Sequence, residues 1–255
     1  MKDINVLSFS GGRTSAFMLA KYKDQMDYVI FCNTGKEANG TLDFVRKCGK
    51  YFDKEIIWLE YTTENPKLFK IVDYNTASRN GEPFEMLIKK NNFLPGENAR
   101  FCTRQMKVYT IKRYLKSLKI DLEYVNMNLG IRKDEPRRYF KLKDNMKDKW
   151  QRVMPLYKDN ITENDVLEFW KNQPFDLEIH SHMGNCDLCF NKKLSKKLHL
   201  IKENPHVANW WIEMEKLIGS KFNKNYTIEK LVKMSNDQID IFDYDNDIEC
   251  YCNID

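Results

Sequence analysis

Short apolar runs recur along the first two thirds of the chain, and stretches with helical spacing separate them. Runs of about five apolar residues predict strands that are buried on both faces, whereas apolar residues every three or four positions predict helices. The predicted strands are residues 4–9, 28–32, 55–59, 122–129 and 152–156. Because strand and helix alternate, we expect an α/β fold with a parallel five-stranded sheet and flanking helices.

The pattern changes after residue 180. From residue 185 onward the chain is expected to be helical, with helices over residues 207–217 and 228–234, and it ends in an acidic stretch. We therefore divide the chain into an α/β domain of residues 1–180 and a helical, cysteine-containing region of residues 181–255.

Composition and charge narrow the class of protein. The 42% hydrophobic and 13% aromatic content supports a folded core and argues against global disorder. No apolar run is long enough to cross a bilayer and the N-terminus lacks a signal-peptide pattern, so we expect a cytoplasmic protein without membrane contact. The net charge of +5 allows phosphate-bearing partners, including nucleic acid, without requiring them.

The chain has seven cysteines. Without an export signal, such cysteines are more often metal ligands, catalytic thiols or buried residues than disulfides. Cys32 lies on a predicted strand and Cys48 on a predicted helix, so both are expected in the core.

A Gly-Gly turn follows the first predicted strand directly. The sequence there is Ser10, Gly11, Gly12, Arg13, Thr14 and Ser15, and a helix is predicted over residues 14–22. Adjacent glycines let backbone amides approach an anion closely, and the helix adds its free N-terminal N–H groups and the positive end of its dipole. The pattern predicts a phosphate-binding loop, and an ordinary strand-to-helix turn is the alternative.

This loop resembles the PP-loop of the ATP pyrophosphatase superfamily, with Thr14 where many members carry Asp. Three later segments resemble its phosphoadenosine phosphosulfate (PAPS) reductase-like branch, of the phage and bacterial type. They are Asn-Thr-Gly-Lys-Glu at 33–37, Arg-Phe-Cys-Thr-Arg-Gln-Met-Lys at 100–107 and Gly-Ile-Arg-Lys-Asp-Glu-Pro-Arg at 130–137. The resemblance runs from residue 4 to about 190 and implies a Rossmann-like sheet with the nucleotide at the carboxyl ends of the strands.

The resemblance also implies which residues bind the nucleotide, either ATP or PAPS. The implied set is Ser8, Ser10, Gly11, Gly12, Arg13, Thr14, Ser15, Asn33, Thr34, Gly35, Lys107 and Gly130. ATP chemistry would also bring Mg²⁺. Arg132 and Arg137 are expected to act in catalysis as an anion clamp, because a guanidinium binds phosphate or sulfate through a planar fork. The alternative is a solvated charged turn.

Cys186 and Cys189 form a C-x-x-C pair, a common metal-ligand spacing, and Cys102 is the expected third ligand. Similar reductases with a [4Fe–4S] cluster carry two neighbouring cysteines upstream, and Phe101 stands at the first of those positions. Three solutions stay open. Cys250 or Cys252 completes the site, His182 completes it in a set that zinc would also accept, or the cluster keeps an open iron. A redox pair or incidental thiols are the remaining alternatives.

Near the C-terminus, Glu249-Cys250-Tyr251-Cys252 resembles the Glu-Cys tail of sulfonucleotide reductases. This resemblance implies that Cys250 and Cys252 are catalytic nucleophiles, because a thiolate in such a tail attacks the sulfonate sulfur. Metal ligation and unpaired surface thiols are the alternatives.

Three functions follow from these features. The first is an enzyme that binds ATP, cleaves it between the α and β phosphates and activates an acceptor for sulfur transfer. The second is a thiol-dependent reductase of PAPS or APS, and the third is a nucleotide-binding defence or sensing protein without turnover. The acceptor is left open between a nucleic acid and a small molecule, and a homodimer is one option for the oligomeric state.

Overall fold

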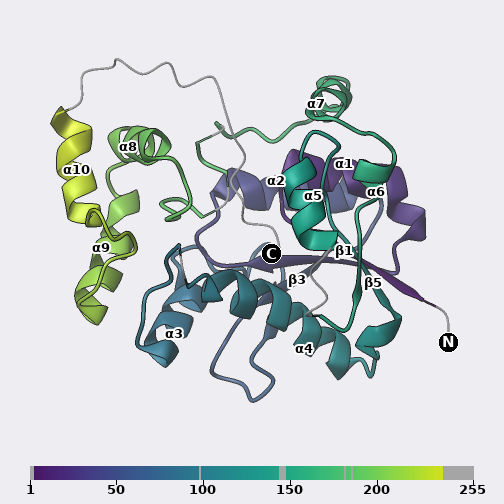
Figure 1. The fold of residues 1–255 in the computed structure, drawn as a ribbon, viewed down its shortest axis with the longest axis horizontal. Coiled ribbons are helices and arrows are strands. Elements are labelled where there is room, and N and C mark those ends of the chain that lie inside the picture. The colour runs from purple at the N-terminus through teal and green to yellow at the C-terminus, as the bar shows by residue number, and fades with distance from the viewer. Residues whose placement is uncertain (1–2, 98, 144–147, 181, 185, 238–255) are drawn as a thin grey trace.

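The computed structural model describes residues 3–97, 99–143, 148–180, 182–184 and 186–237, in which a central sheet is flanked by helices (Figure 1). The strands are β1 (Ile4–Phe9), β2 (Tyr28–Asn33), β3 (Ile57–Glu60), β4 (Lys70–Val72), β5 (Val125–Asn128) and β6 (Gln151–Val153). The α-helices are α1 (Arg13–Tyr22), α2 (Asn39–Tyr51), α3 (Glu82–Asn91), α4 (Thr110–Ser117), α5 (Pro136–Lys143), α6 (Pro155–Lys158), α7 (Glu163–Lys171), α8 (Leu194–Glu203), α9 (Val207–Ile218) and α10 (Ile228–Asp237). Three short elements are η1 (Lys23–Gln25), η2 (Thr103–Tyr109) and η3 (Leu122–Tyr124).

The strands form one sheet in the order β4-β3-β2-β1-β5-β6. Every neighbouring pair is parallel except β3 and β4, which are antiparallel. The α/β prediction is confirmed, since each of the five expected strands lies in the parallel part of this sheet. The edge strand β4 adds a sixth strand that the apolar pattern did not predict, because its central residue, Ile71, is 63% exposed.

Successive residues of the central strands supply the cores on the two faces of the sheet. Leu7, Phe9 and Phe31 pack in one core cluster with residues of α1, α2 and α7. Val6 and Ile30 pack in the other with residues of α4. Both faces are therefore covered, and Figure 1 shows α1, α2 and α7 on one side of the strands and α4 on the other. This burial explains the continuous apolar runs in the sequence.

The helices α8, α9 and α10 form a group beside the sheet (Figure 1). They share a core cluster with α3 that includes Phe84 of α3, Leu198 of α8, Trp211 of α9 and Leu231 of α10. The C-terminal helices are thus attached to the α/β part through apolar packing on α3. Within the described ranges, no helix is both long and apolar enough to span a membrane.

Candidate functional site

The loop between β1 and α1 is held in shape by its own residues. Gly11 has a φ of +81°, in the left-handed region that favours glycine, and a Cβ added there would lie 2.7 Å from Cγ2 of Thr41. Ser15 Oγ donates to the carbonyl oxygen of Gly12 at 2.9 Å and accepts from the amide of Ser10 at 3.2 Å. The loop therefore turns tightly from the end of the strand into the helix.

The helix α1 begins at this loop, and its N-cap residue is Gly12. Glycine has no side-chain oxygen that could accept hydrogen bonds from the amides of the first turn. Those amides can instead donate hydrogen bonds to an anion in front of the helix, which the positive end of the helix dipole also stabilises.

A cavity of about 200 Å³ lies in front of the loop. It is lined by Ser10, Gly11, Gly12, Arg13, Thr14, Thr41, Gly130, Arg132, Glu135, Arg138, Leu177, Ile179 and Gly184. Three arginines and one glutamate belong to this lining, and Asp176, Asp134 and Glu163 also pair with these arginines. The cavity therefore combines backbone donors with guanidinium groups, the two kinds of partner that phosphate groups prefer.

Arg132 is buried beside the loop and is held by several acceptors. Its Nη1 donates to Oγ1 of Thr14 at 3.1 Å, and its Nε donates to Oδ1 of Asp134 at 3.1 Å. The buried carboxylate of Glu135 accepts from the amide of Arg132 at 3.0 Å and forms an ion pair with Arg138. These contacts hold two guanidinium groups in the cavity lining.

Arg13 is paired with a carboxylate from a distant part of the chain. Its Nε and Nη2 donate to the two carboxylate oxygens of Asp176 at 2.7 and 2.8 Å, and Nη2 also donates to the carbonyl oxygen of Leu177 at 3.0 Å. This bidentate pair ties the loop to the segment that contributes Leu177 and Ile179 to the cavity lining. Arg13 therefore helps to position that segment.

The structure brings together part of the predicted nucleotide set. Ser10, Gly11, Gly12, Arg13, Thr14 and Gly130 line the cavity, and Ser15 supports the loop. Ser8, Asn33, Thr34, Gly35 and Lys107 are not among the lining residues. The side chain of Asn33 is fully buried and engaged, because its amide donates to Glu60 Oε1 at 2.6 Å and to the carbonyl oxygen of Ser78 at 2.8 Å. The side-chain oxygen Oδ1 of Asn33 accepts a hydrogen bond from the backbone amide of Gly35 at 3.1 Å.

The structure places Arg138, rather than Arg137, at the cavity. The helix α5 begins at Pro136, and successive residues of a helix point about 100° apart. Arg137 consequently lies on the exposed side of α5, while Arg138 lines the cavity. Sequence reasoning also missed Thr41, Leu177, Ile179 and Gly184, none of which belongs to a segment with a phosphate-binding pattern.

The three cysteines at 102, 186 and 189 line one small cavity of about 20 Å³, together with Thr34 and Lys107. Cys102 precedes η2, whose seven residues have π-helical hydrogen bonding, a rare arrangement that often occurs at functional sites. The cavity has room for about one water molecule or a single ion. A four-iron cluster would therefore require the thiols to move apart.

Around this cavity, Cys186 Sγ lies 3.4 Å from Thr34 Oγ1. Thr34 in turn donates through Oγ1 to Oε2 of the buried Glu37 at 2.7 Å, and Oε1 of Glu37 has no hydrogen-bond partner in the described part of the chain. The nearby Cys32 is a core residue, and burial raises the pKa of its thiol to about 12. Cys32 therefore stays protonated at neutral pH. It does not line the cavity that Cys102, Cys186 and Cys189 share.

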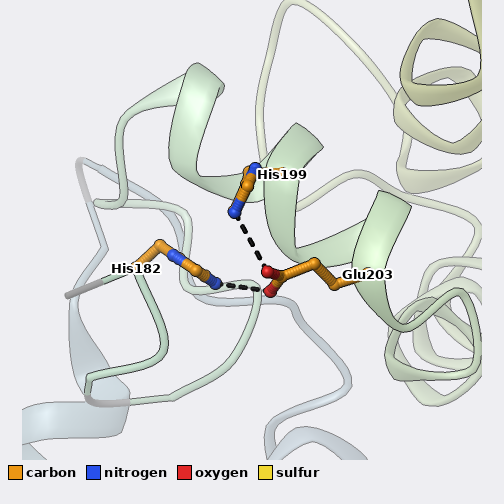
Figure 2. A group of neighbouring side chains, drawn as sticks. All are labelled: His182, His199 and Glu203. Carbon is orange, nitrogen blue, oxygen red and sulfur yellow. Dashed lines mark hydrogen bonds and ion pairs between the residues drawn. The ribbon is translucent and has the colours of Figure 1, made fainter. Parts of the chain in front are cut away.

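His182 does not line the cysteine cavity in this structure. It lies with His199 and Glu203 of α8, and its Nε2 is 2.7 Å from Glu203 Oε2 (Figure 2). Burial lowers the pKa of His182 below its ordinary value, although the hydrogen bond with Glu203 opposes that shift. The two tail thiols of the sequence prediction, Cys250 and Cys252, lie outside the described residues.

The fold and the site together define an α/β protein of the PP-loop class, with a glycine-containing loop between its first strand and its first helix. Residues 4–180 match the sequence model of the phosphoadenosine phosphosulfate reductase domain family. The chain therefore belongs to this family.

Two proteins illustrate the relatives of the chain. An uncharacterized nin region protein of Escherichia phage lambda is 34% identical over 210 residues, which are 76% of this chain and 68% of that protein. An uncharacterized protein of Methanocaldococcus jannaschii is 30% identical over 115 residues, which are 44% of this chain and 23% of that protein. The similarity to the lambda protein confirms the phage-type resemblance.

Proposed function

We propose that this protein binds an adenine nucleotide, preferably ATP, and activates an acceptor for sulfur transfer. The observation that carries the proposal is the cavity in front of α1, whose lining combines the β1–α1 loop with Arg132 and Arg138. Phosphate groups are the ligands that such a combination of backbone and guanidinium donors recognises best.

The proposed chemistry is adenylation. An oxygen of the acceptor attacks the α-phosphorus of ATP, the bond from that phosphorus to the bridging oxygen breaks, and pyrophosphate leaves with the electron pair. A sulfur nucleophile then displaces AMP from the activated acceptor. Donors fixed before the reaction would stabilise the charge that develops on the leaving pyrophosphate. Mg²⁺ would share that charge when it is bound with ATP.

We further propose that the cysteine cavity holds a metal centre. Three thiols from residues 102, 186 and 189 around one cavity support this, because thiolates are strong ligands for both zinc and iron. The family match over residues 4–180 supports treating residues 181–255 as a separate region that adds two of these thiols. Sulfur bound at such a centre would lie on the same molecule as the nucleotide cavity.

A thiol-dependent reductase of PAPS or APS is the second candidate function. The family description favours it, because it names phosphoadenosine phosphosulfate. In this function a thiolate attacks the sulfonate sulfur, the bond from sulfur to the phosphate oxygen breaks, and an added thiol later releases sulfite from the resulting thiosulfonate. A nucleotide-binding protein without turnover is the third candidate.

Product analysis separates these functions. Purified protein is incubated anaerobically with Mg²⁺, a thiol reductant and either ATP or PAPS. The proposal predicts AMP and pyrophosphate from ATP, with water as a slow substitute acceptor. Sulfite release from PAPS that is abolished by Cys250→Ser with Cys252→Ser would favour the reductase. Thermal stabilisation by a nucleotide without any product would favour the third candidate.

A further inference from the structure

A second group of potential ligands lies outside the nucleotide cavity and the cysteine cavity. It consists of His182, from the segment before the C-x-x-C pair, and His199 and Glu203 on α8 (Figure 2). The potential ligand atoms of the three side chains all lie within 4.8 Å of one another. They are therefore close enough together for a single ion to contact all three.

The geometry is convergent. The Nε2 atom of His182 lies 2.7 Å from one carboxylate oxygen of Glu203, and the Nε2 atom of His199 lies 3.1 Å from the other. Figure 2 shows both imidazoles directed at the carboxylate. His199 and Glu203 are four residues apart on α8, the spacing that puts two side chains on one face of a helix.

These separations are close to those of a zinc site. Zinc–nitrogen and zinc–oxygen distances of about 2.0–2.2 Å place two ligands of a tetrahedral ion about 3.3 Å apart. Small side-chain rotations would therefore admit an ion between the three groups. A set of two imidazoles and one carboxylate suits zinc better than magnesium or calcium, which prefer oxygen ligands.

Burial also distinguishes this group from an ordinary surface ion pair. His182 is 6% exposed, and its ring stacks on that of His180 at a centroid distance of 5.4 Å, which restricts its orientation. The side chains of His199 and Glu203 are 26% and 41% exposed, so an ion and a water ligand can reach them from solvent. One fixed ligand and two accessible ligands make an open, preorganised site.

We propose that His182, His199 and Glu203 bind a Zn²⁺ ion, with water in the fourth position. His182 lies between Ile179 and Gly184, which line the nucleotide cavity, whereas α8 belongs to the C-terminal group of helices. The ion would therefore tie the wall of the nucleotide cavity to α8. This site is independent of the cysteine cavity and uses His182 in a different ligand set.

Zinc titration of the full chain tests this proposal. Protein freed of metal with a chelator is titrated with Zn²⁺ by calorimetry, as wild type and as the variants His199→Ala and Glu203→Gln. The matched control is His206→Ala, because His206 is exposed and lies outside the group. We expect one binding event to weaken by at least about tenfold in both test variants, and to change by less than about twofold in the control.

Thermal unfolding provides a second readout, because a ligand that binds only the folded chain raises the unfolding temperature. Zn²⁺ should raise the unfolding temperature of wild type more than that of His199→Ala. The proposal is overturned if wild type binds no Zn²⁺, or if zinc binding and zinc-dependent stabilisation are the same in His199→Ala as in wild type. The latter result would assign all zinc binding to the cysteines.

Discussion

The nucleotide cavity and the cysteine cavity are built in different ways. The nucleotide cavity is lined by residues 10–14 after β1, by residues 130–138 after β5, and by Thr41, Leu177, Ile179 and Gly184, none of which belongs to α8, α9 or α10. The cysteine cavity is lined by residues of the stretches 102–107 and 186–191 together with Thr34, Phe84 and Trp211 of α9. The first site therefore depends on the turns after two neighbouring strands, whereas the second also depends on how α9 packs.

The largest expected effect comes from breaking the local geometry of the nucleotide loop. In Gly11→Ala, the left-handed backbone costs about 1–2 kcal/mol and the close contact with Thr41 about 1–3 kcal/mol, so the free energy of unfolding should fall by about 2–5 kcal/mol. Urea denaturation measures this change. Gly12→Ala is the matched control, because an added Cβ there meets only Oγ of Ser10, at 3.7 Å. Equal losses in the two variants would contradict the role given to Gly11.

The next effect tests the contacts that Asp187 makes with Lys36 and with Trp211 of α9, next to the cysteine cavity. Asp187 lies beside Cys186, forms an ion pair with the buried Lys36 at 3.0 Å and accepts from Trp211 Nε1 at 2.6 Å. Asp187→Ala would leave Lys36 unpaired in a buried position, so we expect a loss of about 2–4 kcal/mol in the free energy of unfolding.

The control for Asp187 is Glu229→Ala, which removes the exposed ion pair with Lys216 on the C-terminal helices. Exposed ion pairs contribute little to stability, so this variant should unfold at nearly the same urea concentration as wild type. If Asp187→Ala behaves like this control, the two regions are not held together through Asp187.

A smaller effect distinguishes the two neighbouring arginines of α5. Arg138→Ala should weaken ATP binding by about tenfold, because it removes a charged donor from the cavity. Arg137→Ala should change the affinity by less than about twofold, because Arg137 is exposed. Calorimetric titration of both variants with ATP makes the comparison. A larger loss of ATP affinity in Arg137→Ala than in Arg138→Ala would show that Arg137 binds the nucleotide, and would contradict the positions of these two residues on α5.

The smallest effect concerns the thiols of the core. Burial raises the pKa of Cys32 to about 12, so the reactive thiolate is scarce until the pH rises toward that value. In the folded protein at pH 8, iodoacetamide should leave Cys32 unmodified, whereas denatured protein should react fully. Peptide mass spectrometry measures both. Rapid labelling of Cys32 in the folded protein would show that this part of the core opens.

The parallel part of the fold could be predicted because its strands are continuous apolar runs. The edge strand β4 could not, since it has three residues and pairs with β3 alone. Such a strand is fixed by its neighbour rather than by an apolar pattern of its own.

The candidate site was predictable where sequence neighbours stay neighbours in space. Gly11 follows β1 and Arg132 follows β5, and these two parallel strands are neighbours in the sheet, so their carboxyl ends lie side by side. Arg138 depends on where α5 begins, which a motif does not specify. His182 was predicted beside the C-x-x-C cysteines, whereas in the structure its ring lies against Glu203, and the four-residue spacing of His199 and Glu203 was a usable signal for that group.

The central claim is that the cavity in front of α1 binds the phosphates of an adenine nucleotide. Calorimetric titration of ATP into wild type, Arg132→Gln and Lys133→Ala tests it most directly, with thermal unfolding of each variant as a check of folding. Lys133 is exposed and next to Arg132 but does not line the cavity, so it controls for the loss of one charge. We predict that ATP binds wild type and Lys133→Ala alike and binds Arg132→Gln about 10- to 100-fold more weakly. Absence of binding to wild type, or equal affinity in Arg132→Gln, would contradict the account.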